Sequence, residues 1–121
     1  MRFFIGLGLA SVVGLGACHS SHIQVTVENR TGASIRLLEV DYPSASFGSD
    51  RLDSGASYHY RIQVQGSGPL KVQYTAGTGG QQQGQKQIEG PVLAERQEGA
   101  VDIILLPDGK AEFRPRLSGD R

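Results

Sequence analysis

The stretch that decides the fold class is residues 58–76, Tyr-His-Tyr-Arg-Ile-Gln-Val-Gln-Gly-Ser-Gly-Pro-Leu-Lys-Val-Gln-Tyr-Thr-Ala. Every second residue from Tyr58 to Val64 is apolar, and the same alternation returns from Leu70 to Ala76. A period of two residues is typical of β-strands that bury one face. The Gly-Ser-Gly-Pro run between the halves supplies turn residues. The stretch therefore predicts two strands that pair as a hairpin.

The polar residues of this hairpin are expected to share one face of a sheet. They include two or three positive groups and no carboxylate, which makes them a candidate docking face for a protein or a cell-wall glycan. The competing interpretation is an outer face that only meets water. The residues of this candidate binding face are His59, Arg61, Gln63, Gln65, Lys71, Gln73 and Thr75.

Further strands are predicted on the N-terminal side of the hairpin. Apolar and polar residues alternate from Ile23 to Glu28. Within residues 33–42 the alternation changes phase near Leu37 and Leu38. A β-bulge there would turn both apolar sets toward the core, and a strand buried on both faces is the alternative.

Residues 43–56 contain mainly Ser, Gly and Asp, with two isolated large apolar residues at Phe47 and Leu52. We expect a loop or a short edge strand that these two residues pin to the core. Pro43 ends the preceding strand because proline cannot donate to a β-ladder.

The C-terminal part predicts a loop followed by more strands. Residues 77–87 have no sizeable apolar side chain, so burial cannot offset their ordering entropy and we expect a mobile loop. Val92 and Leu93 form a short core-facing piece. Residues 101–106 are the most apolar run, which indicates a central strand. Pro115 places the last strand at an edge.

Seven or eight short strands without a helical period predict one all-β domain, a single antiparallel β-sandwich over residues 23–117 with a tail at 118–121. A small barrel is the alternative. Trp is absent and there is a single Cys, so the core must be held without internal disulfides.

One segment bears on the type of sandwich. Leu52-Asp53-Ser54-Gly55-Ala56-Ser57-Tyr58 resembles the tyrosine-corner segment of fibronectin type III and related immunoglobulin-like domains, with Ser54 in place of the usual proline. The resemblance implies an immunoglobulin-like sandwich in which the Tyr58 hydroxyl bonds back to nearby backbone. It also implies that the chain crosses between the sheets here.

The N-terminus has the pattern of a signal. Arg2 precedes an apolar run at residues 3–14, which is followed by Leu15-Gly16-Ala17-Cys18. As a helix, the roughly 16 residues from Phe3 to Cys18 would span about 24 Å, less than the hydrocarbon thickness of about 30 Å. A signal peptide is therefore favoured over a spanning helix.

The residues Leu15, Gly16, Ala17 and Cys18 resemble the bacterial lipobox. The resemblance implies removal of residues 1–17 and lipidation of Cys18, whose several acyl chains would anchor the protein in a membrane. The alternative is an ordinary secretory signal. Against it, Leu15 is large where ordinary cleavage requires a small residue, and Cys18 has no second cysteine to pair with.

Residues 18–22 form the lipidated cysteine and a short tether that reaches only about 14 Å beyond it. His19 stands where inner-membrane lipoproteins typically carry Asp, so the resemblance implies the outer membrane, most simply on its periplasmic side. Loss of Arg2 with the signal leaves one more acidic than basic residue. Net charge thus provides no argument for nucleic acid as a partner.

Chemical motifs are weak throughout. His19 and His22 have the spacing that places two imidazoles on one face of a helix, and His59 could join them in a metal site. They lie in a short tether, however, and no third ligand is near them in the sequence, so a solvated linker is favoured. Residues 77–80 lack the Gly-Lys-Ser/Thr of a phosphate-binding loop, and no Gly-x-Ser-x-Gly is present. We therefore expect no catalytic residues, no metal and no cofactor.

The hypothesis from sequence is an envelope lipoprotein, not an enzyme, whose sandwich acts as a protein-interaction or accessory module. A lipoprotein that binds a glycan or another small ligand is the alternative. Sugar binders usually expose aromatic rings, whereas the tyrosines of residues 58–76 fall in the core-facing set, so the first hypothesis is favoured.

Overall fold

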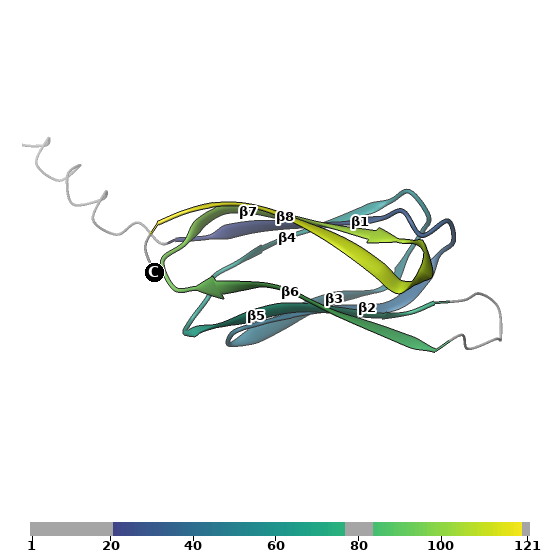
Figure 1. Ribbon diagram of the computed structural model, residues 1–121, viewed down its shortest axis with the longest axis horizontal. Coiled ribbons are helices and arrows are strands. Elements are labelled where there is room, and N and C mark those ends of the chain that lie inside the picture. Colours follow the sequence, from purple (N-terminus) through teal and green to yellow (C-terminus); the bar gives the residue numbers. More distant parts are fainter. Residues whose placement is uncertain (1–20, 77–83, 120–121) are drawn as a thin grey trace, which may run out of the picture.

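The computed structural model describes residues 21–76 and 84–119, and it confirms the predicted all-β fold with two sheets (Figure 1). Sheet A has the strand order β4-β1-β7-β8, and sheet B has the order β3-β2-β5-β6. The elements are β1 (Ile23–Asn29), β2 (Ile35–Tyr42), β3 (Ala45–Leu52), β4 (Ser57–Ile62), β5 (Ser67–Thr75), β6 (Gln85–Ala94), β7 (Glu98–Leu106), the single-turn 3-10 helix η1 (Pro107–Gly109) and β8 (Lys110–Ser118).

The inner faces of the two sheets form one core. Every second residue of β1 faces inward, as its alternation predicts, whereas in β7 Ile104 is buried as well as the core-facing Val101, Ile103 and Leu105. The described hydrophobic residues buried in this core cluster are Ile23, Val25, Val27, Ile35, Leu38, Val40, Phe47, Leu52, Ile62, Val64, Leu70, Val72, Tyr74, Leu93, Val101, Ile103 and Leu105.

Sheet A is not wholly antiparallel, so the prediction of an antiparallel sandwich is wrong in one pair. β1 and β7 run parallel, with Val25 opposite Val101 and Val27 opposite Ile103. The other strand pairs of both sheets are antiparallel. A period of two residues specifies which face of a strand is buried, but it does not specify the direction of the neighbouring strand.

The predicted hairpin of residues 58–76 does not form. β4 lies in sheet A, where Ile62 is opposite Ile23 of β1, whereas β5 lies in sheet B beside β2 and β6. Val64 in the connection is buried, and Gly66 adopts a φ of 87°. Burial of Val64 between the sheets draws the chain across the sandwich, and the glycine allows the turn that follows.

The predicted bulge in β2 is confirmed, but its effect on Leu37 differs from the expectation. The register of β2 against β5 shifts between Arg36 and Glu39, and Leu37 adopts a φ of 52°. Leu38 is buried in the core, whereas Leu37 is 61% exposed. The extra residue is thus turned outward, whereas Ile35 before it and Leu38 and Val40 after it are buried, so both apolar sets reach the core except at Leu37 itself.

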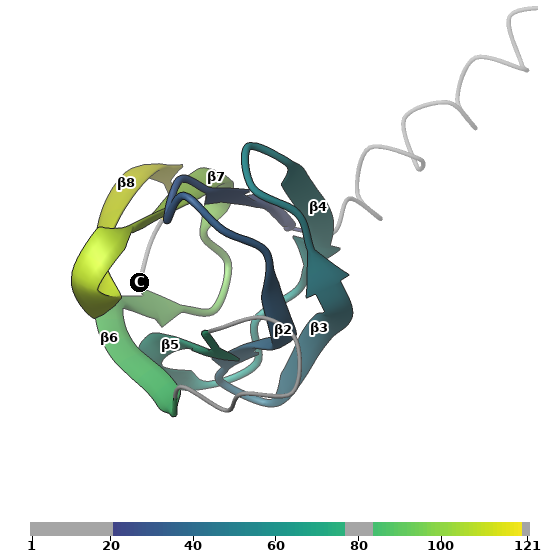
Figure 2. The ribbon, with the colours of Figure 1, turned by 90° about the vertical axis from the view of Figure 1, so that its right-hand side faces the viewer.

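Edge strands meet on both sides of the sandwich (Figure 2). β3 lies beside β4 on one side, and β6 lies beside β8 on the other. The predicted edge positions of residues 43–56 and of the strand with Pro115 are confirmed, as is the central position of residues 101–106. Phe113 of β8 covers Gly90 of β6, where a Cβ atom would collide with the ring.

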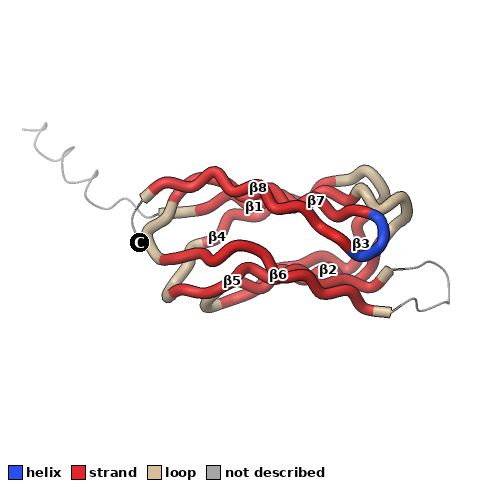
Figure 3. Tube along the Cα trace, in the orientation of Figure 1, coloured by secondary structure: helices blue, strands red, loops and turns tan. Residues whose placement is uncertain are grey.

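The sandwich has two distinct ends. β1 begins and β8 ends at one of them, which we call the tether end because residues 21–22 lead into it (Figure 3). The opposite end carries the connections at residues 30–34 and 53–56 and the turn η1 (Pro107–Gly109). We call it the far end.

The segment that resembles a tyrosine corner does cross between the sheets, from β3 to β4. Tyr58, however, is half-buried and stacks on Phe47 with ring centroids 6.1 Å apart. Within the described part of the chain its hydroxyl makes no hydrogen bond. Asn29 makes the backbone bonds instead: its Nδ2 donates to the carbonyl oxygens of Leu52 at 2.9 Å and Ala33 at 2.8 Å.

Several predictions concern residues outside the described ranges. These are the signal peptide 1–17, the lipobox with Cys18, residues 19–20 of the tether, residues 77–83 of the expected loop, and residues 120–121 of the tail. The expected loop 77–87 also ends earlier than predicted, because Gln85 to Gln87 already belong to β6.

Candidate functional site

The seven residues of the candidate binding face do not form one surface. His59 and Arg61 lie on the outer face of sheet A, whereas Lys71, Gln73 and Thr75 lie on the outer face of sheet B. Gln63 and Gln65 lie in the connection between β4 and β5 at the tether end. The prediction of a single shared face is therefore wrong, because it depended on the hairpin.

On the outer face of sheet A, polar and charged side chains contact their neighbours on adjacent strands. Thr26 Oγ1 and His59 Nδ1 are 3.0 Å apart, and Arg61 is opposite Gln24. Arg116 donates to Asp102 at 2.8 Å. Further exposed ion pairs on this side of the molecule join Arg30 to Glu28 and Arg114 to Glu112, each at 2.7 Å. Such exposed pairs contribute little to stability, and this arrangement is typical of a solvated face.

Gln63 and Gln65 belong to a hollow of about 330 Å³ at the tether end. Glu95 accepts a hydrogen bond from the backbone N–H of Gly66 at 2.9 Å, which ties the β4–β5 connection to the β6–β7 turn. The Ser44 hydroxyl accepts a longer bond from the N–H of Gln65 at 3.4 Å. These contacts give the connection its shape and present no convergent set of side chains.

On sheet B, the structure places carboxylates beside the predicted residues. Gln73 is opposite Glu39, and Lys71 lies between Asp41 on β2 and Glu89 on β6. From the sequence, no carboxylate was expected on the candidate face. Because β5 pairs with β2 and β6 rather than with β4, carboxylates of these two neighbours lie beside its outward-facing residues.

Glu39 and Asp41 form a coupled pair on β2. The pKa of Asp41 is raised to about 6. Burial is the largest cause, and a hydrogen bond with Glu39 and the negative charge of Glu39 act in the same direction, while the charge of Lys71 opposes the shift. Two carboxyl groups that share one site favour a single bound proton. Asp41 therefore loses or gains its proton near pH 6.

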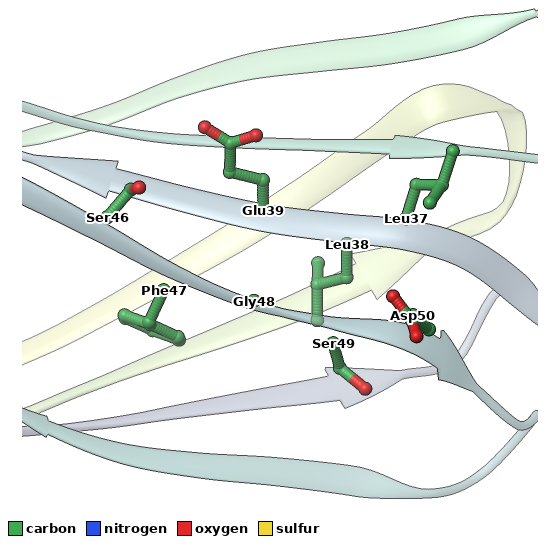
Figure 4. A pocket seen from close by; sticks show the side chains of 8 residues that line it. All are labelled: Leu37, Leu38, Glu39, Ser46, Phe47, Gly48, Ser49 and Asp50. Atoms are coloured by element: carbon green, nitrogen blue, oxygen red, sulfur yellow. The ribbon is translucent and has the colours of Figure 1, made fainter.

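A groove lies beside this pair, between β2 and β3 (Figure 4). Gly48 is opposite Glu39 and has no side chain to fill the groove. A larger residue does not fit there, because a Cβ atom at position 48 would collide with the Leu38 carbonyl oxygen. Leu37, Glu39 and Ser46 project to one side of the two strands, and Leu38, Phe47 and Ser49 project to the other. The groove encloses about 540 Å³, and Asp50 also lines it.

We call this region, with the acidic pair next to it, the Gly48 groove; its residues are Leu37, Glu39, Asp41, Ser46, Gly48 and Asp50. It combines three carboxyl groups with one exposed leucine. Such a surface can bind a cationic group that also carries an apolar side chain. Sequence reasoning missed it, although the alternation of Glu39 and Asp41 with buried residues was a usable signal.

An exposed tyrosine is a second feature that the sequence analysis did not place. Tyr60 has the same alternation as the core residues, yet it is 44% exposed and stacks on Phe47 with centroids 4.6 Å apart and an interplanar angle of 19°. It lies on β4, at the side where β4 meets the edge strand β3. The prediction that the tyrosines face only the core is therefore wrong for Tyr60.

Within residues 21–76 and 84–119, His, Cys, Asp and Glu side chains do not gather in threes as a metal site requires. In the same ranges the structure holds no helix with the length and apolar character to cross a membrane. Comparison of the chain with protein-family models, with curated proteins and with solved structures found no match.

Proposed function

We propose that this protein is a bacterial envelope lipoprotein whose β-sandwich, of the immunoglobulin-like type, binds a protein partner and is not an enzyme. One observation carries the anchoring: the lipobox-like Leu15-Gly16-Ala17-Cys18 follows a short apolar run and stands only a few residues before β1. Lipid on Cys18 would hold the domain at a membrane.

The short tether sets the orientation in this proposal. Residues 19–22 reach about 14 Å when extended, so the tether end would lie against the membrane and the far end would point away from it. His19 after the cysteine favours the outer membrane, with the domain in the periplasm. The outer faces of both sheets would then run along the membrane normal and remain accessible to a partner.

The Gly48 groove is the surface that we assign to the partner. Leu37 is exposed and has a φ of 52°, a conformation that costs a non-glycine residue free energy. The fold does not need a leucine there, since its side chain leaves the core. The adjacent carboxyl groups favour a partner that presents lysine or arginine beside an apolar contact.

Glycan binding remains the second candidate because of Tyr60. Its ring is held parallel to Phe47 and is partly exposed, which is the arrangement that stacks on a sugar ring. The two candidates use different residues, so they can be tested separately.

The anchor is tested by Cys18→Ser in cells. We expect the uncleaved precursor to accumulate without acyl label; normal cleavage and membrane retention in this variant would refute lipidation. The working surface is tested by placing a photo-crosslinking residue at Ser46 in the groove and, as a matched control, at Gln24 on sheet A. We expect a protein adduct from position 46 only.

Equal adducts from both positions, or none from position 46, would refute the groove as the partner site. For the glycan alternative, Tyr60→Ala is compared with wild type for retention on purified cell-wall material. Loss of retention would favour glycan binding, and unchanged retention would exclude a role for the Tyr60 ring.

A further inference from the structure

A separate pocket of about 270 Å³ opens at the far end, between the two sheets. Its walls come from the connection after β1, the end of β5, the start of β6 and the β7–β8 turn. Ile35, Tyr74 and Leu106 supply apolar walls, and Lys86 and Asp108 supply charges. Neither the lipid anchor nor the Gly48 groove uses any of these residues.

Tyr74 carries the first observation. The residue is 1% exposed, and its hydroxyl has no hydrogen-bond partner within residues 21–76 and 84–119. Burial alone raises its pKa above the ordinary value. Buried hydroxyl groups normally find a partner, because leaving one unpaired costs the whole of its desolvation. An unpaired phenol in the wall of a pocket therefore indicates a place for a polar atom of a ligand.

Lys86 carries the second observation. It lies directly opposite Tyr74 in the β5–β6 register and is half-buried. Its aliphatic part crosses toward the β7–β8 turn, so that a Cβ atom on Gly109 would lie 3.1 Å from Lys86 Cδ. No carboxylate of the described residues forms an ion pair with it. The pocket thus offers, beside the unpaired phenol, a cation that makes no ion pair with Asp108 or any other carboxylate of the described residues.

We propose that this pocket binds a small organic acid with an apolar ring or short chain and one polar group at its opposite end. The carboxylate binds Lys86, the apolar body contacts Ile35 and Leu106, and the polar group forms a hydrogen bond with the Tyr74 hydroxyl. The volume is near the lower limit of ligand pockets, about 300 Å³, so the body is no larger than a single substituted ring.

The probes are 4-hydroxyphenylacetate, phenylacetate, which lacks the second polar group, and 4-hydroxyphenylethylamine, which reverses the charge. Each is titrated into ¹⁵N-labelled full-length protein in detergent, and amide shifts are followed. We expect shifts at Ile35, Tyr74 and Leu106 with 4-hydroxyphenylacetate, about three- to tenfold weaker binding of phenylacetate, and no localised shifts with the amine.

Variants assign the contacts. Tyr74→Phe should remove the difference between the two acids, and Lys86→Gln should weaken both of them. Lys110→Gln is the matched control, because Lys110 is exposed at the same end and does not line the pocket. We expect it to bind both acids as wild type does.

Two results would overturn the proposal. One is the absence of localised shifts with either acid at about 10 mM probe. Such a result would mean an affinity weaker than that of any specific site of this kind. The other is unchanged affinity in Lys86→Gln together with new dimerisation, since an inward lysine on an edge strand can instead serve to block strand pairing.

Discussion

Asn29 and Leu52 join the two sheets at the far end: the Asn29 Nδ2 atom donates to the Leu52 carbonyl oxygen at 2.9 Å, linking the last residue of β1 to the last residue of β3. Asn29 is fully buried and is the one buried polar residue in the described part of the chain. Its Oδ1 accepts a hydrogen bond from the N–H of Thr31 at 3.0 Å. Its backbone N–H donates to the carbonyl oxygen of Ala56, and its backbone carbonyl oxygen accepts from the N–H of Gly55.

Asn29→Ala should therefore destabilise the domain strongly. The substitution removes the side-chain donor to the Leu52 carbonyl and the acceptor for the N–H of Thr31, and it leaves the Ala33 carbonyl with only the Thr31 hydroxyl as donor. We expect a loss of about 2–4 kcal/mol in the free energy of unfolding, measured by denaturant titration. Gln24→Ala, an exposed change on the same strand, should stay within about 0.5 kcal/mol, and an equal loss in both variants would contradict the role of Asn29.

Asp41 should make stability depend on pH. Its pKa is about 6 in the folded protein and near 3.8 when unfolded, so the folded state binds its proton more tightly. The stability from this proton is fully present below pH 3.8 and is lost as pH rises through 6. Asp41→Asn should flatten this part of the unfolding profile between pH 4 and 7.

Asp53 is the matched control for that experiment. Hydrogen bonds from Arg51 and Ser34 and the charge of Arg51 lower its pKa, so its contribution is present above pH 3.8 and is lost as pH falls. Asp53→Asn should alter only the acid side of the profile. An unchanged slope between pH 4 and 7 in Asp41→Asn would contradict the raised pKa.

Leu37→Gly should stabilise the domain while weakening partner capture. Glycine adopts a φ of 52° without the steric cost that leucine pays there, and the leucine side chain is exposed. We expect a gain of about 0.5–1 kcal/mol in unfolding free energy and fewer crosslinked adducts from position 46. Arg36→Gly is the control, because it has the same loss of side chain without a positive φ. A gain in stability with undiminished adducts would show that Leu37 is not a contact residue.

Tyr74→Phe tests the unpaired hydroxyl without any ligand. Removal of a hydrogen-bonded tyrosine hydroxyl typically costs about 0.5–1.5 kcal/mol, whereas removal of an unpaired buried one costs nothing or stabilises. We expect a change between zero and a gain of about 1 kcal/mol in thermal or denaturant unfolding. A loss of more than about 1 kcal/mol would mean that the hydroxyl has a partner in the folded protein.

The sequence by itself determined the strands and their buried faces. The alternation in residues 23–28 predicts which side chains enter the core, because side-chain direction in a strand repeats every two residues, and the apolar run 101–106 predicts a central strand. Pro115 predicted an edge, since it has no N–H to donate. The β2 bulge followed from the phase change at Leu37 and Leu38. All of these are local properties that short segments carry on their own.

Only the tertiary structure decided which strands are neighbours, and with that the surfaces. The same alternation in β4 and β5 fits a hairpin and two separate sheets equally well, because pairing depends on contacts between distant segments. Burial of Val64 separated the two strands and divided the candidate face. Placement of β5 beside β2 brought Gln73 to Glu39, and the arrangement of the sheets left the Tyr74 hydroxyl without a partner. These surfaces combine residues far apart in the chain, and only the packing of the two sheets brings them together.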